Sequence, residues 1–381
     1  MISLVGTWTQ ITAEAYLVFE LTHSPSYLGY VGFVAGVPSW IFMFYGGVIA
    51  DRVSKKLVLM ITQCLMMILS CILAYLTFTG LIQPWHILIL SFFSGVVIAF
   101  DAPARQSFVN ELVHTEHLTN AIALNATMFN AAAAVGPAFS GLLYALVGPA
   151  WCFTINAFSF IAVIIGLGLI KIDMKTVTKK TTSVISDLKE GFRYIKSQKI
   201  VKTFIIGAAM ISVFGVSFTT LIPAWSVKIL GGDSTTNGML QSARGVGALM
   251  SALLLASLGT ANFKGKLYAM GTLLVPVFIF LFAVFHWTPA AFLTLFIIGS
   301  STVLVYNLTN AFLQFLIPAE LRGRVLAVYT FTFFGLMPIG SLLIGTTADW
   351  IGETWSIILF SSILFSSSTY FYLTVPKIRQ L

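Results

Sequence analysis

Long apolar runs alternate with short polar loops along this chain, and the basic residues follow the loops in a regular order. When the runs are threaded back and forth across a membrane, all of the 21 Lys and Arg residues except Lys228 and Arg244 fall on the loops and helix ends of one side. Basic residues of short loops stay on the cytoplasmic side of a membrane. The pattern therefore predicts a multi-pass membrane protein with both termini in the cytoplasm and an even number of spans.

The composition agrees with a membrane-embedded chain. Hydrophobic residues make up 58% of the 381 residues and charged residues only 9%, whereas a soluble protein has about 25% charged residues. The net charge of +8 is divided among separate loops, so we expect no nucleic-acid partner. The cysteines and histidines do not have the spacing of metal ligands. We therefore expect no metal and no cofactor.

A transmembrane helix needs about 20 mostly apolar residues, and on this criterion the chain has about twelve transmembrane helices. We therefore predict an all-α integral membrane protein. Its compact loops and short tails are typical of a bacterial plasma membrane. The sequence indicates no dimer face, so we expect a monomer in the lipid bilayer. The predicted spans are residues 2–20, 27–50, 57–80, 85–109, 118–146, 150–170, 201–228, 236–258, 266–286, 290–316, 325–348 and 354–375.

Residues 171–200 form the longest polar stretch and divide the predicted spans into two equal sets. We predict an N-terminal six-helix bundle over residues 1–170, a cytoplasmic linker over 171–200 and a C-terminal six-helix bundle over 201–381. From Ser186 the linker has the pattern of a short amphipathic helix on the membrane surface, and a plain linker is the alternative. The apolar face of that helix consists of Leu188, Phe192 and Ile195.

The two halves carry the same glycines in the same order. This ordered match predicts two parallel six-helix repeats, which is the architecture of a transporter with a binding site between its halves near the membrane midplane. Gly29, Gly36 and Glu111 recur at one offset as Gly238, Gly245 and Glu320, and Gly136, Gly141 and Gly148 recur with identical spacing as Gly340, Gly345 and Gly352.

A charged motif follows the second predicted span. It resembles the signature of the major facilitator superfamily, G-x-x-x-D-R-x-G-R-R/K, although Ser54 replaces the second glycine. The resemblance implies a cytoplasmic gate, in which the glycine allows close helix packing and the acid faces a helix N-terminus of the other half. A basic loop without a gating role is the alternative. The matching residues are Gly47, Asp51, Arg52, Lys55 and Lys56.

Two further charges lie at the inner end of the fourth predicted span. Asp101 and Arg105 flank Pro103, and we assign both to the same gate. Asp101 is expected to pair there with Arg52 or Lys55.

The fifth predicted span contains a Gly-Pro pair. Proline inside a helix removes a backbone hydrogen bond and kinks the helix. The string with Gly136, Pro137 and Gly141 partly resembles the span-5 motif of drug/proton antiporters. This resemblance implies a face that packs against the eighth span. An ordinary packing kink is the alternative.

Four further strings are similar to the major facilitator branch that contains the enterobactin exporter and macrolide-efflux-like proteins. The resemblance implies proton-driven export of amphipathic small molecules. A solute uptake symporter and a non-transporting membrane sensor or assembly partner remain alternatives. We expect no enzyme, because the sequence contains no phosphate-binding loop and no nucleophile beside a base. The strings are Phe100–Gln106, Asn120–Ala121, Leu188–Tyr194 and Leu321–Val325.

Two ionisable residues lie inside the predicted spans. Glu14 belongs to the first span and Arg244 to the eighth, at similar depths in opposite halves. Charged groups at membrane depth are costly and mostly functional. We predict that they pair and that protonation of Glu14 weakens the pair, which would couple transport to protons. Binding of a cationic substrate by Glu14 and a purely structural pair are the alternatives.

The first, fourth, seventh and tenth spans line the cavity if the superfamily arrangement holds. Apolar walls with few polar groups suit an amphipathic ligand. Asp349 and Glu353 are expected at the outer surface in contact with water. The residues predicted to bind the small-molecule substrate are Gln10, Tyr16, Trp225, Asn307, Asn310 and Gln314.

Overall fold

The computed structural model describes residues 1–170, 184–257 and 263–380, and within these ranges it leaves the side chains of 43–44, 46–52, 110–111, 115, 118–119, 184–189 and 379–380 undescribed. The described residues fold into helices and contain no strand. In the first half, the helices are α1 (Ile2–Thr22), α2 (Pro25–Arg52), α3 (Lys55–Phe78), α4 (Pro84–Leu112), the 3₁₀ turn η1 (Thr115–His117), α5 (Leu118–Val147) and α6 (Pro149–Leu169).

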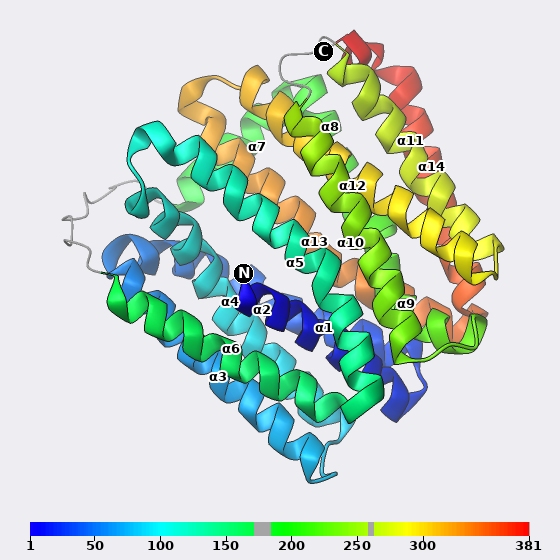
Figure 1. The fold of residues 1–381 in the computed structure, drawn as a ribbon. Coiled ribbons are helices and arrows are strands. Elements are labelled where there is room, and N and C mark those ends of the chain that lie inside the picture. The colour runs from blue at the N-terminus through cyan, green and yellow to red at the C-terminus, as the bar shows by residue number, and fades with distance from the viewer. Residues whose placement is uncertain (171–183, 258–262, 381) are drawn as a thin grey trace.

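The second half begins with a short helix and continues through six long helical segments (Figure 1). Its first long segment starts as α8 and runs without a break to Ile229. The remaining elements are α7 (Val184–Ser197), α8 (Lys199–Met210), η2 (Ile211–Gly215), η3 (Val216–Leu221), α9 (Ile222–Ala224), η4 (Trp225–Ile229), α10 (Ser234–Ser257), α11 (Lys264–Val284), α12 (Thr288–Leu316), α13 (Ala319–Ile351), α14 (Glu353–Thr374) and η5 (Pro376–Gln380).

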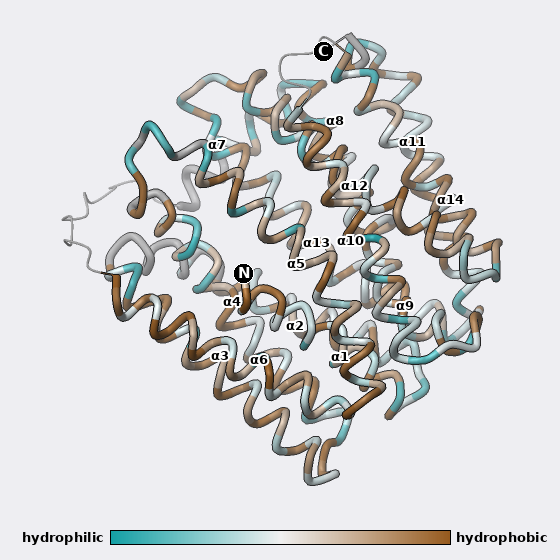
Figure 2. The backbone as a smooth tube through the Cα atoms, in the orientation of Figure 1, coloured by the Kyte–Doolittle hydropathy of each residue, from teal (hydrophilic) through white to brown (hydrophobic). Residues whose placement is uncertain are grey.

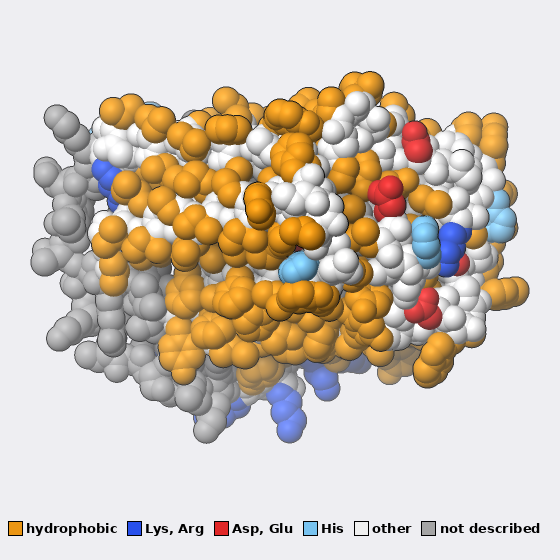
Figure 3. Space-filling model, turned by 90° about the horizontal axis from the view of Figure 1, so that it is seen from below, with side chains coloured by type: hydrophobic (Ala, Val, Ile, Leu, Met, Phe, Trp, Pro, Cys, Tyr) orange, Lys and Arg blue, Asp and Glu red, His pale blue; other side chains and the backbone are white. Residues whose placement is uncertain are grey.

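Ten helical segments in the described ranges are long and apolar enough to cross a membrane. Hydrophobic residues dominate them (Figure 2), and a broad surface of hydrophobic side chains lies between the two ends of the molecule (Figure 3). The chain is therefore a multi-pass membrane protein, with ten spans on this measure where the sequence predicts about twelve. The helices of more than 20 residues outside the ten are α1 and α2, and α1 carries Gln10, Glu14 and Glu20 among its 21 residues.

The segment from Lys199 to Ile229 departs twice from α-helical geometry. Residues 211–215 and 225–229 form π turns, and residues 216–221 form a 3₁₀ turn between them. Such stretches occur where a helix is under local constraint and are frequent at functional sites. Pro223 follows the 3₁₀ turn, where it begins a new α-helical turn.

The predicted surface helix is present as α7, two residues longer at its start than expected. On its predicted apolar face, Ile195 is 6% exposed and Phe192 is 56% exposed, and the side chain of Leu188 lies outside the described residues. Helix α7 is docked on α13 of the second half. Arg324 Nη1 donates to Glu190 Oε2 over 2.6 Å, and Gly191 lies beside the backbone of Arg324.

The buried hydrophobic residues separate almost completely into the two parts of the chain. The largest cluster runs from Ile195 to Ile378. Two smaller clusters contain residues from Ala13 to Leu167. Ala224 is the one buried residue of the later part that joins an early cluster.

The two parts meet along two helix pairs, α2 with α13 and α5 with α10. In Figure 1, α5 and α10 lie side by side across the middle of the molecule. We call these two contacts the α2/α13 seam and the α5/α10 seam. Small residues line both seams and let the backbones approach closely.

The helices define two ends of the molecule. One end, which we call the basic end, holds the start of α3, helix α7 and the start of α8, where lysines and arginines gather. The opposite end carries Asp, Glu and His side chains, which form a group at one side of Figure 3. Every hydrogen bond between α2 and α13 or between α5 and α10 that joins described side chains lies toward this opposite end or the middle of the helices.

Candidate functional site

The carboxyl group of Glu14 lies between two helices of the first half, near the middle of α1. Ser91 Oγ on α4 donates to Glu14 Oε1 over 2.5 Å. Gln10 lies one turn earlier on the same helix. The hydrogen bond from Ser91 holds the Glu14 carboxyl beside α4.

Gln10 belongs to a polar network within the first half. Its Oε1 accepts hydrogen bonds of 2.7 Å from Ser70 Oγ on α3 and from Asn156 Nδ2 on α6. Asn156 Oδ1 in turn accepts from Ser159 Oγ. Gln10, predicted to bind substrate, therefore points toward α3 and α6, and a residue at membrane depth has its polar atoms satisfied by neighbouring helices.

Arg244 lies on α10 and does not pair with Glu14 in this structure. Its Nε is buried and has no hydrogen-bond partner. Among the residues whose side chains are described, no ion pair joins the two charges. An unpaired guanidinium nitrogen at this depth is costly, which marks Arg244 as a group available for a partner that the protein itself does not supply here.

Three predicted substrate residues share one face of α12. Asn307 and Asn310 are half-buried and Gln314 is exposed, while the intervening residues Leu308 and Phe312 are buried. Gln314 Nε2 donates to Asn310 Oδ1 over 2.5 Å. This polar face therefore keeps hydrogen-bonding capacity outside the helix core.

The two predicted aromatic substrate residues lie in different surroundings. Tyr16 is half-buried on α1 and packs edge-to-face on Tyr144, with ring centroids 5.1 Å apart. Trp225 is fully buried and packs on Phe282, with ring centroids 4.8 Å apart. Trp225 thus belongs to the core of the second half in this structure, contrary to its expected place on a cavity wall, because its large apolar ring fills the space between neighbouring helices.

Three of the gate residues, Asp101, Arg105 and Lys56, make contacts within the first half. Asp101 is buried and forms an ion pair with Arg105 one turn later on α4. Its Oδ1 accepts hydrogen bonds from Thr62 Oγ1 (2.8 Å) and Gln63 Nε2 (2.9 Å), both on α3. Lys56 Nζ donates to the carbonyl oxygens of Gly168 and Ile170 at the end of α6.

These contacts link α3, α4 and α6 at the basic end. The side chains of Asp51 and Arg52, and the surroundings of Gly47, lie outside the described part of the chain. Lys55 lies at the start of α3. The expected contact of Asp101 with Arg52 or Lys55 therefore stays a prediction, and the partners that are described belong to the same half as Asp101.

The antiporter-like motif lies where α5 meets α1 and α10. A Cβ at Gly136 would lie 2.5 Å from Cβ of Trp8, so this glycine accommodates α1. Pro137 has no N–H for the carbonyl of Ala133, and Gly245 of α10 approaches that carbonyl oxygen closely. Gly141 meets α10 one turn further on. The kinked face of α5 therefore packs against α10, the predicted eighth span.

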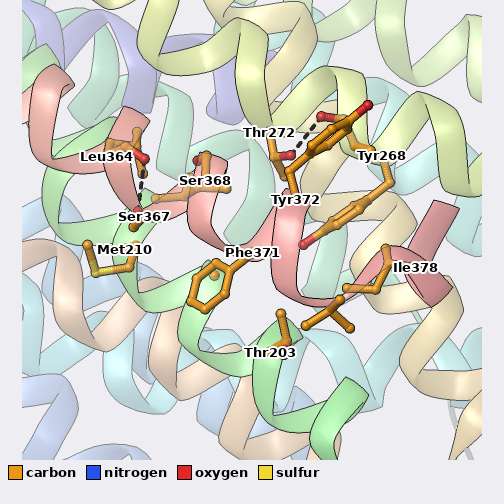
Figure 4. A pocket seen from close by; sticks show the side chains of 14 residues that line it. Thr203, Met210, Tyr268, Thr272, Leu364, Ser367, Ser368, Phe371, Tyr372 and Ile378 are labelled. Carbon is orange, nitrogen blue, oxygen red and sulfur yellow. Dashed lines mark hydrogen bonds between the residues drawn. The ribbon is translucent and has the colours of Figure 1, made fainter.

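One well-defined pocket lies inside the second half, away from both seams. Figure 4 shows Tyr268, Tyr372, Phe371 and Ile378 around it, with hydroxyl groups of Thr203 and Ser367 on other sides. The pocket lies between α8, α11 and α14 near the basic end. It contains none of the residues that the sequence assigns to substrate, to the gate or to proton coupling.

Two contacts at the opposite end escaped the sequence analysis. Asp349 is exposed as expected, but its Oδ2 accepts from Ser24 Oγ over 2.8 Å, across the two halves. Glu353 is only 8% exposed, which contradicts the expected solvated position. Lys228 Nζ lies 2.8 Å from its Oε1. The one available signal was Lys228 itself, a basic residue on the side that otherwise lacks them.

Known transport proteins are similar to this chain over most of its length. The staphyloferrin A transporter of Staphylococcus aureus (strain NCTC 8325 / PS 47) is 27% identical over 372 residues, which are 96% of this chain and 92% of that protein. The macrolide efflux protein A of Streptococcus pyogenes is 22% identical over 363 residues, 92% of this chain and 88% of that protein. Both are transporters by name, so the expectation of a transporter and not an enzyme is confirmed.

The fold and the family agree with these relatives. The structure of a D-xylose-proton symporter superposes with a TM-score of 0.79 and 12% identity, covering 100% of this chain and 98% of that one. This likeness shows the fold alone. The family model described as transmembrane secretion effector matches residues 1–380. The chain therefore belongs to the transmembrane secretion effector family of the major facilitator superfamily.

Proposed function

We propose that this protein exports amphipathic small molecules, of the drug or siderophore type, in exchange for protons. The observation that carries the proposal is the carboxyl of Glu14, which lies near the middle of α1 and accepts a hydrogen bond from Ser91 of α4. A carboxyl at membrane depth is costly, and such groups mostly mark a pathway for a substrate or for protons. The relatives named above as a macrolide efflux protein and a staphyloferrin A transporter support the class of substrate.

The proposed architecture has twelve transmembrane helices in two parallel six-helix repeats. Residues 1–170 and 201–381 form the two bundles, and 171–200 the linker. The separation of the buried clusters supports this division. The gathering of basic residues at one end supports a cytoplasmic position for that end and for both termini. We propose a monomer in a bacterial plasma membrane.

The proposed mechanism is alternating access by rocking of the two halves. In this structure the seams carry cross-half hydrogen bonds toward the opposite end, whereas Asp101 and Lys56 at the basic end bond within the first half. We assign this arrangement to a state open toward the cytoplasm. In the other state, Asp51 and Arg52 would reach the second half and close the basic end.

Substrate and proton are proposed to compete for the space between the halves. The polar face of α12 with Asn307, Asn310 and Gln314 provides hydrogen-bonding groups for the substrate. Arg244, whose Nε has no partner, provides a cation toward which Glu14 or an acidic group of the substrate can move. Proton uptake by Glu14 would remove that attraction and favour release.

The test is proton-coupled transport in liposomes with an acidic interior and a fluorescent pH reporter inside. A catechol siderophore, a macrolide and a lipophilic cation are added outside in turn. The wild type is expected to release protons with at least one compound, and Glu14→Gln to lose this release while still exchanging that compound. Glu20→Gln is the matched control, because Glu20 lies on the same helix near its exposed end.

Each outcome decides a separate part of the proposal. Release that persists in Glu14→Gln would assign the proton site to another residue, with Asp101 as the next candidate. Exchange of a compound without any proton release in the wild type would rule out antiport. Loss of release in Glu20→Gln as well would show that the effect is not specific to Glu14.

A further inference from the structure

The N-terminus of α2 is capped by a residue of the other half. Asp349, near the end of α13, accepts hydrogen bonds through Oδ2 from Ser24 Oγ (2.8 Å) and from the backbone N–H of Ser26 (3.2 Å). Ser26 Oγ donates to the carbonyl of Gly345 over 3.5 Å, one turn earlier on α13. These contacts join the outermost turns of α2 and α13.

The capping has a clear physical basis. The first N–H groups of a helix have no partner within the helix, and a negative charge is favoured beside them. Pro25 at the start of α2 has no N–H, so Ser26 has the first free backbone donor. A carboxylate acceptor for this donor normally comes from the residue just before the helix. Here the chain supplies it from 323 residues away.

The other seam is built differently at the equivalent position. The repeat that relates Gly29 to Gly238 places Ser24 where the second half has Asp233. Asp233 caps its own helix α10, since its Oδ1 accepts from Thr236 N over 2.9 Å and from Thr236 Oγ1 over 3.1 Å. Two acids at one end of the molecule thus cap two equivalent helices, one within its own half and one across the halves.

A cation makes a second cross-half contact at the same end. Lys228 Nζ lies 5.5 Å from the ring centroid of Phe19 on α1, within the range of a cation–π interaction. On its own side, Lys228 lies 2.8 Å from Oε1 of Glu353, at an angle unsuited to a hydrogen bond. Glu353 is buried and begins α14, so it fixes Lys228 at this position by charge.

We propose that Asp349 and Lys228 form the outer gate of the transporter, which closes the extracellular end while the cytoplasmic end is open. This inference rests on the proposed alternating access and names the residues that must separate when the halves rock. Asp349 releases α2, and Lys228 leaves Phe19 while keeping Glu353. The gate is one-sided, because in both contacts the charged group belongs to the second half.

The test measures the distances between the halves by electron paramagnetic resonance on the full chain in lipid nanodiscs. The three cysteines are first replaced by serine. One nitroxide pair is then placed on Leu81 of the first half and Trp287 of the second half, two exposed loop residues that both lie at the end opposite the basic end. A second pair is placed on Leu112 and Phe315, exposed residues near the basic end.

Asp349→Ala is expected to raise the population with a long Leu81–Trp287 distance roughly fivefold, the effect of losing one capping carboxylate. The Leu112–Phe315 distance should shorten in the same population, which simple loosening of the protein would not produce. Lys228→Met should shift both distances in the same direction.

Asp233→Ala is the matched control, because it removes a helix cap at the same end whose hydrogen bonds stay within the second half. It is expected to leave both distances unchanged. Equal distance distributions in Asp349→Ala and wild type, or equal shifts in Asp349→Ala and Asp233→Ala, would overturn the gate. If Asp349→Ala does not fold, Asp349→Asn replaces it, because asparagine keeps an acceptor for the Ser26 N–H. Distance distributions identical to those of the wild type in both Asp349→Asn and Lys228→Met would also overturn the proposed gate. Because the readout is a distance and not a proton flux, it remains decisive if proton coupling fails.

Discussion

Gly141 and Gly238 meet backbone to backbone where the two halves join, since a Cβ at Gly238 would lie 2.9 Å from Cα of Gly141. Gly29 and Gly345 make the same contact on the other seam, where a Cβ at Gly345 would lie 2.8 Å from Cα of Gly29. The internal repeat relates Gly29 to Gly238 and Gly141 to Gly345. One glycine contact is therefore used twice, and both seams need helices that approach closely.

Gly238→Ala is expected to destabilise the protein by about 1–3 kcal/mol, the usual cost of overpacking. The added methyl group would lie 2.3 Å from the carbonyl oxygen of Pro137, and a backbone oxygen cannot move aside as a side chain can. Thermal unfolding in nanodiscs measures the loss. Gly166→Ala on α6 is the control, because a Cβ there meets nothing within 4 Å. Equal melting temperatures of the two variants would contradict close packing at the seam.

Trp225→Phe is expected to keep both stability and substrate affinity. Trp225 is fully buried and its Nε1 has no hydrogen-bond partner, so phenylalanine loses ring area but no polar contact. Trp225→Ala, by contrast, should cost about 3–5 kcal/mol because it leaves a cavity. Thermal unfolding and titration with a transported compound separate the two effects. A large loss of substrate affinity in Trp225→Phe at an unchanged melting temperature would show that Trp225 takes part in substrate binding.

The sequence predicted the helices, the membrane class and the family because each depends on local or compositional patterns. The predicted substrate residues lie in different surroundings, because periodicity shows which residues share a helix face but not what that face contacts. Asn307 lies on a partly exposed face, whereas Gln10 bonds to Ser70 and Asn156 and Trp225 is in the core. Polar and aromatic residues serve a cavity wall and a helix interface equally well.

Contacts between distant parts of the chain were beyond sequence reasoning. Glu14 and Arg244 have similar depth, but depth alone does not fix the rotation of each helix, and Glu14 faces Ser91. The contact between Ser24 and Asp349 spans 325 residues. No local pattern marks such a pair, because a half-buried serine before one helix and an exposed aspartate near the end of another are ordinary residues at helix ends.

Asn307→Ala is expected to weaken substrate binding roughly five- to tenfold, the effect of losing one hydrogen bond to a ligand. The melting temperature should stay close to that of the wild type, because Asn307 is half-buried and the described contacts give its amide no hydrogen bond. Titration of purified protein with a transported compound measures the affinity. Asn130→Ala is the control, since the Asn130 amide is bonded to Ala126 O within its own helix. Equal substrate affinities of both variants and the wild type would show that Asn307 and its face of α12 do not bind the substrate.

Asp233 should make stability depend on pH at the acidic end of the range. The backbone N–H of Thr236 is the main cause that holds the pKa of the Asp233 carboxyl below its usual value. A group with a lowered folded-state pKa contributes stability that is complete above its unfolded pKa of about 4 and is lost as the pH falls through the folded pKa. Asp233→Asn keeps a capping acceptor that does not titrate. The melting temperature of the wild type, relative to that of Asp233→Asn, should therefore be constant between about pH 7 and pH 5 and decrease below about pH 4. A difference that stays constant down to about pH 3 would show that the negative charge of Asp233 contributes nothing to folding.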